Sequence, residues 1–102
     1  MMNFLQGDII KIEGFRNSFL IISKNSFITK TNVFHVCPIM AGIPKGPLHI
    51  VIKGENDTIG TALCEQIKLI DPSVRTCAKT DCIPYEQMMN ISDALQGVFE
   101  CN

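Results

Sequence analysis

The side chains best suited to chemistry in this sequence include two histidines and two arginines, which are widely separated along the chain. His35 and His49 change charge nearest to neutral pH, so either can serve as a general acid or base. His35 stands between Phe34 and Val36 in an apolar segment, where a single histidine more often packs or faces solvent. Acid–base catalysis and a structural role therefore both stay open for the two histidines.

Arg16 and Arg75 are the only arginines in the 102-residue chain, so any site for phosphate depends on them. The formal net charge is −1, whereas proteins that hold nucleic acid by overall electrostatics are usually basic. This balance excludes binding spread over the whole surface and leaves a local site or a groove in a dimer. Solvated or ion-paired surface cations are the competing interpretation of both arginines.

Five cysteines, at positions 37, 64, 77, 82 and 101, form an odd set that argues against a disulfide framework. Cys37 and Cys64 lie in apolar runs, which favours reduced thiols that pack as small core residues. Cys77 and Cys82 are separated by four residues, and both histidines lie far upstream, so a zinc site is weakly supported. We expect no metal and no cofactor.

Short apolar segments divided by turn residues predict a mainly β (α+β) protein of one domain over residues 1–102. Strand character appears at 7–13, 18–23, 33–39, 48–52, 58–64 and 67–70, within a sheet of five to seven antiparallel strands. The first two strands form a hairpin around a turn at 14–17, and the polar segment 24–32 predicts a loop. Pro38 places the end of the third strand near an edge or a bulge.

The spacing of apolar residues changes after Pro84, which suits the first turn of a helix. The apolar positions then recur every three or four residues, at Met88, Ile91, Leu95, Val98 and Phe99. This pattern predicts an amphipathic C-terminal helix that packs on the sheet, and its acidic opposite face argues against a membrane-surface role. The first six residues have no basic, apolar leader, and no apolar run approaches the roughly 20 residues of a membrane span. We therefore expect a cytoplasmic protein.

Four segments carry a resemblance to a known family. Residues 7–10 read Gly-Asp-Ile-Ile, residues 19–27 read Phe-Leu-Ile-Ile-Ser-Lys-Asn-Ser-Phe, and residues 36–40 read Val-Cys-Pro-Ile-Met. The most specific segment is Glu-Gln-Ile-Lys-Leu-Ile-Asp at 65–71, followed by Arg75. In this order, and with a helix at the end, the segments resemble the MazF/PemK family of toxin–antitoxin ribonucleases, whose strongest motif is [Asp/Glu]-Gln-x-[Arg/Lys]-x-Ile-Asp.

The resemblance implies a small SH3-like, MazF-type barrel that assembles as a homodimer. Family enzymes cut single-stranded RNA without a metal, use the 2′-hydroxyl of the RNA as the nucleophile, and leave a cyclic phosphate. A cognate antitoxin normally inserts a tail into the same groove. We therefore expect a toxin of a type II toxin–antitoxin system that acts as an endoribonuclease.

Carried over residue by residue, the resemblance implies Arg16 as the group that stabilises the phosphorane or donates a proton. Glu65 and His35 are the accompanying catalytic candidates. The RNA-binding candidates are Asn17, Ser18, Gln66 and Arg75.

Structural roles compete with these functional assignments. Asn17 and Ser18 can act as local caps of the turn. Glu65 can pair with Arg16, and Gln66 can satisfy buried backbone groups. Asp71 is expected to cap its own turn.

Two departures from the family pattern bear on activity. Members usually carry a Gly-Ser-Glu-Gln-x-Gly-x-Arg-Pro loop between the first two strands, where this chain has only residues 14–17. Asn17 aligns with the family arginine, or Arg16 does if the register slips by one residue. Met40 replaces a threonine and cannot supply its hydrogen bond. An alternative function is therefore a non-catalytic module that binds an antitoxin or a protein target such as gyrase, as the related CcdB does.

Overall fold

The computed structural model describes the backbone of residues 3–99 and the side chains of residues 3–97. Its elements follow in the order β1 (Asp8–Ile12), β2 (Ser18–Ile21), α1 (Asn25–Thr31), β3 (Phe34–Met40), β4 (His49–Lys53), β5 (Ile59–Leu63), β6 (Lys68–Ile70), β7 (Cys77–Cys82) and α2 (Tyr85–Phe99). All pairings between the strands are antiparallel. The predicted fold class is confirmed, with seven strands and a C-terminal helix.

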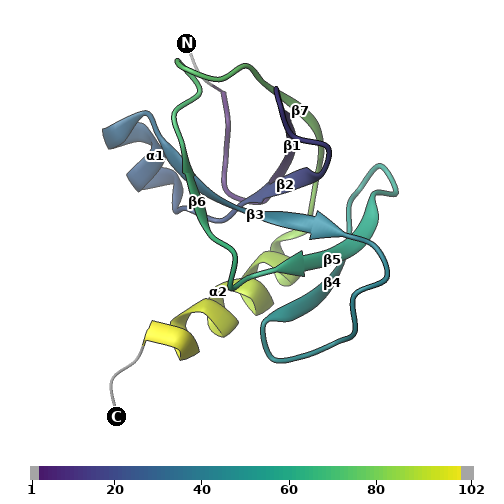
Figure 1. The fold of residues 1–102 in the computed structure, drawn as a ribbon. Coiled ribbons are helices and arrows are strands. Elements are labelled where there is room, and N and C mark those ends of the chain that lie inside the picture. The colour runs from purple at the N-terminus through teal and green to yellow at the C-terminus, as the bar shows by residue number, and fades with distance from the viewer. Residues whose placement is uncertain (1–2, 100–102) are drawn as a thin grey trace.

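The strands are ordered β4-β5-β3-β2-β1-β7, and β6 pairs with β3 beside β5. β3 is long enough to use two partners on one side: Phe34 faces Ile70 of β6, and Ile39 faces Ala62 of β5. Figure 1 shows β1, β2, β3, β6 and β7 around one core, with the hairpin β4–β5 and α2 beside it. The predicted hairpin of the first two strands is confirmed as β1 and β2.

Pro38 does not mark a sheet edge, so the edge alternative of that prediction is wrong. β3 lies inside the sheet, and Pro38 faces Phe19 of β2. The pairing with β6 ends at Val36, and the pairing with β5 begins at Ile39. Pro38 therefore lies where β3 passes from one partner to the next, a break in the ladder that tolerates a missing N–H.

The loop predicted at 24–32 contains helix α1, so the loop assignment is wrong for most of that segment. The carbonyl of Lys24 accepts hydrogen bonds from the backbone N–H groups of Phe27 and Ile28. Asn32 ends the helix in the left-handed conformation, with φ of 58°, and its N–H bonds to the carbonyl of Ile28 at 2.8 Å. Ile28 is the buried residue of the helix, and one apolar anchor produces no helical period in the sequence.

Strand β7 was not among the predicted segments. It forms an edge of the sheet beside β1, with a register shift opposite Ile9 and Ile10. In β7 a polar residue does not mark an exposed position. Lys79 is exposed, but the carboxylate of Asp81 is buried. The pattern of a half-buried strand is therefore absent from this part of the sequence.

Two apolar cores lie on opposite faces of the central strands. The core under α2 contains Ile9, Leu20, Cys37, Ile39, Ile52, Ala62, Cys64, Ile83, Met88 and Ile91. The core inside the barrel contains Ile10, Ile12, Phe19, Ile21, Ile28, Phe34, Val36 and Ile70. The apolar run of the second strand is therefore buried on both faces, as a continuous run of this kind predicts.

The predicted apolar face of α2 is confirmed for its described side chains, because Met88 and Ile91 are buried and Leu95 packs against the same core. The side chains of Val98 and Phe99 lie outside the described part of the chain. Within the described residues, no helix is long and apolar enough to cross a membrane.

The cysteine prediction is confirmed for the two buried positions. Cys37 and Cys64 are free thiols in the core under α2, and Cys77 and Cys82 are also free. A hydrogen bond with Cys64, together with burial, raises the pKa of the Cys37 thiol. Cys101 lies outside the described residues.

Candidate functional site

The turn between β1 and β2 places Arg16 and Asn17 at the surface. Gly14 has a φ of 92°, and the N–H of Phe15 bonds back to the carbonyl of Ile12 at 3.1 Å, which reverses the chain tightly. Both Arg16 and Asn17 are exposed. Lys11 donates from Nζ to the backbone carbonyl of Arg16 at 2.9 Å, so a second cation lies beside the turn.

The two positions that depart from the family pattern lie at the same end of the sheet. Ser18, the first residue of β2, is half-buried and faces Ile39 of β3. The next positions of the two strands, Asn17 and Met40, therefore lie close together, and Met40 in turn faces Thr61 of β5. The strand pairing therefore places the β1–β2 turn and the end of β3 on one surface.

Phe15 brings two further cations to the turn. The Cζ atom of Arg75 lies 5.1 Å from the centre of the Phe15 ring, and Nζ of Lys68 lies 5.9 Å from it. Phe15 also meets Phe19 edge to face, with 5.3 Å between ring centres. Arg75 is therefore not a member of a surface ion pair among the described residues, but a cation held over an aromatic ring.

Glu65 pairs with His49, and the suggested pair of Glu65 with Arg16 is wrong. The Nε2 atom of His49 lies 2.9 Å from both carboxylate oxygens of Glu65, and Nδ1 lies 3.1 Å from the carbonyl oxygen of Pro44. Each ring nitrogen of His49 therefore faces an oxygen atom, and the two contacts hold the imidazole in place. The contact ties the β3–β4 loop to the end of β5, beside a pocket of about 210 Å³.

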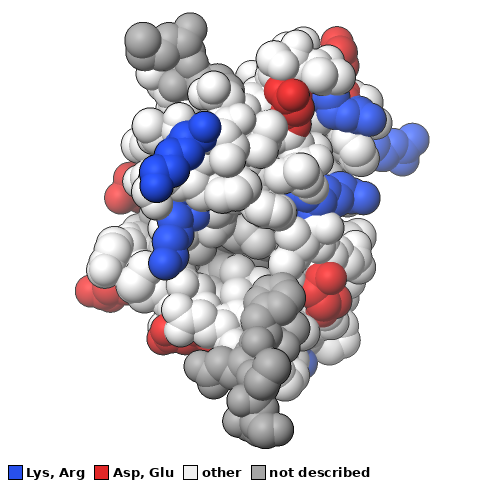
Figure 2. All heavy atoms as spheres, turned by 90° about the vertical axis from the view of Figure 1, so that its left-hand side faces the viewer, with Lys and Arg blue, Asp and Glu red and all other residues white. Residues whose placement is uncertain are grey.

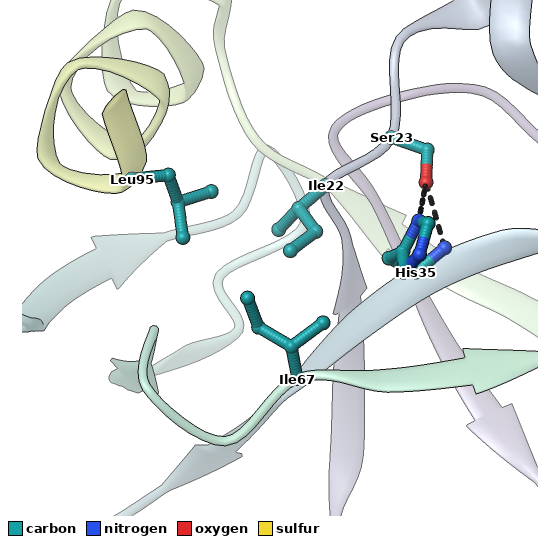
Figure 3. Close-up of a pocket in the computed structure, with 5 residues that line it drawn as sticks. All are labelled: Ile22, Ser23, His35, Ile67 and Leu95. Carbon is teal, nitrogen blue, oxygen red and sulfur yellow. Dashed lines mark hydrogen bonds between the residues drawn. The ribbon is translucent and has the colours of Figure 1, made fainter. Parts of the chain in front are cut away.

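The side of the molecule that carries α1 and β6 has a hollowed centre. Figure 2 shows this centre without charged side chains, and basic side chains stand on both of its flanks. A pocket of about 420 Å³ is lined by Ile22, Ser23, His35, Ile67 and Leu95. In Figure 3 the three apolar side chains point toward one another across the pocket, with His35 and Ser23 at one end.

His35 is held by a serine at the end of β2. Its Nδ1 atom lies 3.0 Å from Oγ of Ser23, and the same oxygen accepts the backbone N–H of His35 at 2.7 Å. The ring also packs against Phe27, with 5.2 Å between ring centres. His35 is therefore a half-exposed histidine with a fixed ring, at the wall of an apolar pocket.

The structure does not bring the three catalytic candidates into contact. Arg16 lies beyond one end of the β2–β3 ladder and His35 near the other. At about 3.3 Å per residue, they are roughly 20 Å apart along the strands. Within the described residues, no hydrogen bond or ion pair joins Arg16, His35 and Glu65.

Gln66 has an exposed side chain, so its suggested role in satisfying buried backbone groups is wrong. The capping role of Asp71 is confirmed, because its Oδ1 atom accepts hydrogen bonds from the N–H and the hydroxyl of Ser73 at 2.9 and 2.6 Å. These bonds lower the pKa of Asp71. In the described part of the chain, no group of three or more potential metal ligands is found.

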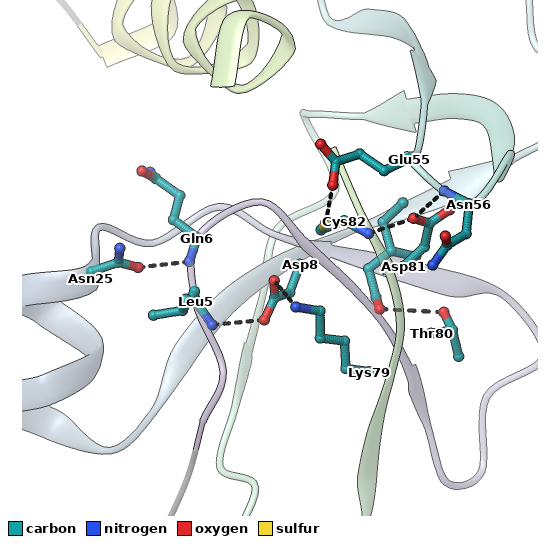
Figure 4. Close-up of polar contacts among 11 residues, drawn as sticks. Leu5, Gln6, Asp8, Asn25, Glu55, Asn56, Lys79, Thr80, Asp81 and Cys82 are labelled. Carbon is teal, nitrogen blue, oxygen red and sulfur yellow. Dashed lines mark hydrogen bonds and ion pairs between the residues drawn. The ribbon is translucent and has the colours of Figure 1, made fainter. Parts of the chain in front are cut away.

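A second carboxylate anchors the fold on β7. Asp81 accepts hydrogen bonds from the backbone N–H groups of Asn56 and Thr58, at 2.9 and 3.1 Å, and Figure 4 shows it facing Asn56. Burial acts to raise the pKa of Asp81, but hydrogen bonds from Thr58, Asn56 and Cys82 outweigh it and lower the pKa to about 2. This contact fixes the β4–β5 turn against β7.

Sequence reasoning missed Phe15, Lys68 and Lys11 as residues of the turn site. Lys68 stood inside the Glu-Gln-Ile-Lys-Leu-Ile-Asp block, so the motif already contained a signal for it. Phe15 lay inside the segment assigned to the turn. Its contact with Lys68 and Arg75 joins residues more than fifty positions apart, which no local pattern reveals.

Several solved structures share this fold. A MazE–MazF structure from Deinococcus radiodurans (Form-II) is 14% identical, with a TM-score of 0.83 over 100% of each chain. An endoribonuclease in complex with its cognate antitoxin, from Mycobacterial species, is 14% identical, with a TM-score of 0.81 over 98% of this chain and 100% of that chain. An endoribonuclease from Mycobacterial species is 18% identical, with a TM-score of 0.79 over 95% and 91%. At these identities the similarity shows the fold alone.

Family membership rests on a match in sequence. No curated protein matches the chain. The family model described as PemK-like, MazF-like toxin of type II toxin–antitoxin system matches residues 5–99, which include every described strand and helix. The chain therefore belongs to the PemK-like, MazF-like toxin family of type II toxin–antitoxin systems.

Proposed function

We propose that this toxin is a metal-independent endoribonuclease that cuts single-stranded RNA at the β1–β2 turn. The observation that carries the proposal is the meeting of both arginines of the chain at this turn. A Cβ atom on Gly14 would lie 3.7 Å from Nη1 of Arg75, and Arg16 is two residues further along. In a protein of net charge −1, this places both arginines at one turn, where a phosphate can be held.

The reaction needs little from the protein beyond charge and proton transfer. The 2′-hydroxyl of the RNA attacks the adjacent phosphorus, the bond to the 5′-oxygen breaks, and a 2′,3′-cyclic phosphate forms. Arg16 stabilises the negative charge that develops on the phosphorane, while Asn17 and Ser18 donate hydrogen bonds to the phosphate oxygens. Gln66 and Arg75 contact the RNA beside the reacting phosphate.

Glu65 and His35 are the candidates for moving the protons. Both are engaged within the chain, by His49 and Ser23, and among the described residues neither is hydrogen-bonded or ion-paired to Arg16. In the proposed enzyme, a second copy of the chain places them beside the first copy's turn. The proposal therefore includes a homodimer, a cognate antitoxin as the inhibitor of the groove, and action in the cytoplasm.

Incubation of the purified protein with a long single-stranded RNA, with and without EDTA, tests this function. The expected result is cleavage that survives EDTA and leaves 2′,3′-cyclic phosphate ends. Arg16→Ala should lose cleavage and growth inhibition, whereas Lys30→Ala, which removes an exposed cation on α1, should keep both. Absence of cleavage by the wild type, or full activity of Arg16→Ala, would reject the proposed mechanism.

A non-catalytic module is the second candidate function, and Met40 at the threonine position favours it. The pocket lined by Ile22, Ile67 and Leu95 is apolar enough to receive an apolar side chain of a protein partner. This candidate predicts stable retention of gyrase or of the antitoxin by a protein that does not cut RNA. RNA cleavage by the purified wild-type protein would reject it.

A further inference from the structure

We propose that Lys68 and Arg75, held against the ring of Phe15, bind two phosphates of single-stranded RNA beside the cleavage site. The inference rests on the proposed function and names how the substrate strand is gripped. Together with Lys11 and Arg16 these residues form what we call the Phe15 cluster, in which two cations lie over one aromatic ring and two more belong to the adjoining β1 strand and turn.

The cluster has a geometry that suits neighbouring phosphates. The cationic groups of Arg75 and Lys68 each lie within 6 Å of the same ring centre, which keeps them at most about 11 Å apart. Neighbouring phosphates of an extended single strand can span that separation. The two cations come from different segments, β6 and the loop before β7, so a bound strand crosses between them.

The cluster is built on fixed parts of the fold. Phe15 packs its ring edge to face on Phe19, a fully buried residue of the barrel core. Lys68 is paired in register with Val36 of β3, and the backbone N–H of Arg75 bonds to the carbonyl of Asp71 at 3.1 Å. A site whose backbone is held in advance loses less entropy on binding.

The cations of the cluster are available to a ligand. Within the described residues, the ion pairs are His49–Glu65, Lys53–Asp57 and Lys79–Asp8, and none of them uses a cation of the cluster. The carboxylate of Asp71 is engaged by Ser73, and Glu13 is the acidic residue nearest to Phe15 in the sequence. The cluster therefore keeps a local positive charge, although the chain as a whole is acidic.

Single-stranded RNA fits this surface better than an acidic peptide. Proteins that hold single strands combine cations that follow the backbone with aromatic rings near the bases, and both occur here. The cluster also includes Arg16, to which the proposed reaction assigns the scissile phosphate. A strand bound by Arg75 and Lys68 is therefore led directly to the site of cleavage.

Binding of a 2′-O-methyl oligonucleotide separates recognition from chemistry, because the blocked hydroxyl prevents cleavage. Fluorescence anisotropy at several salt concentrations would compare Lys68→Gln, Arg75→Gln and Phe15→Leu with the matched control Lys30→Gln on α1. Each charge removal should weaken binding about 5- to 10-fold near 0.1 M salt and reduce the slope of log K against log salt by about 0.7. Phe15→Leu should weaken binding while circular dichroism confirms the native fold.

The outcomes distinguish this inference from the proposed function. If the wild type cuts RNA while Lys68→Gln and Arg75→Gln bind like Lys30→Gln, the cluster is not an RNA anchor and the RNA contact of Arg75 falls with it, whereas metal-independent cleavage at Arg16 stands. If the wild type does not cut RNA but binds the blocked strand with the expected salt slopes, the anchor stands and the ribonuclease proposal fails. If poly-glutamate of equal charge binds more tightly than the oligonucleotide, the assignment to RNA is overturned.

Discussion

Replacing Asp81 with asparagine should destabilise the fold in a strongly pH-dependent way. Asp81 is 1% exposed and sits on β7, where its carboxylate accepts the backbone N–H groups of Asn56 and Thr58 across the β4–β5 turn. A Cβ atom on Gly54 would overlap this carboxylate, so the turn closes directly around it. Asparagine keeps the volume but replaces one accepting oxygen with an amide that donates.

The size of the effect follows from these bonds. A hydrogen bond to a charged group contributes about 1.5–3 kcal/mol to stability, and the amide removes the charge from the bonds of Asn56, Thr58 and Cys82 and leaves only one oxygen to accept them. The pKa of Asp81 is about 2, below its ordinary value of 3.8, because the hydrogen bonds favour the ionised form. That difference corresponds to about 2 kcal/mol of stability at neutral pH. We therefore expect Asp81→Asn to cost about 2–3 kcal/mol at pH 7.

The sign of the pH dependence is fixed by the lowered pKa. The unfolded chain takes up a proton at Asp81 near pH 3.8, while the folded chain resists protonation down to about pH 2. The contribution of Asp81 is therefore complete above about pH 5, shrinks between pH 4 and 2, and is lost below that range. The difference between wild type and Asp81→Asn should narrow over the same interval.

Urea unfolding followed by circular dichroism at pH 7, 4 and 2.5, with equal protein concentrations, would measure this difference. Asp57→Asn is the matched control, because Asp57 lies in the same turn, is exposed, and its carboxylate makes only a 4.0 Å contact with Lys53 among the described residues. We expect the control to change the free energy of unfolding by less than about 0.5 kcal/mol. A gap between Asp81→Asn and wild type that is equal at pH 7 and 2.5 would refute the reasoning.

Three further substitutions have defined expectations. Ser23→Ala leaves the backbone N–H of His35 without its 2.7 Å acceptor and should lower stability by about 1–3 kcal/mol in urea unfolding, with Ser26→Ala on the exposed face of α1 unchanged. Gly60→Ala places a methyl group against a core side chain of β3 and should lower the melting temperature by several degrees, unless β5 shifts. Glu65→Gln removes a half-exposed ion pair and should cost under about 1 kcal/mol, so a larger loss in unfolding experiments would contradict a surface role.

Local patterns in the sequence determined most of the sheet and the terminal helix. The hairpin of β1 and β2 and the apolar face of α2 follow from residue spacing, because side chains that share a face recur at fixed intervals. The cap at Asp71 is equally local, since its donors lie two residues away. The Glu-Gln-Ile-Lys-Leu-Ile-Asp block, read beside the other segments, was enough to indicate the family.

The remaining features depend on partners that are distant in sequence. β7 takes its hydrogen bonds from β1, about seventy residues earlier, and α1 is held by the burial of Ile28 in a core assembled by other strands. Whether Glu65 would meet Arg16 or His49 was decided by the register of β4 on β5, which sets His49 opposite Leu63. The sequence alone therefore determined which residue types could hold a phosphate. Only the tertiary structure decided which of them meet, because Phe15, Lys68 and Arg75 become neighbours when the barrel closes.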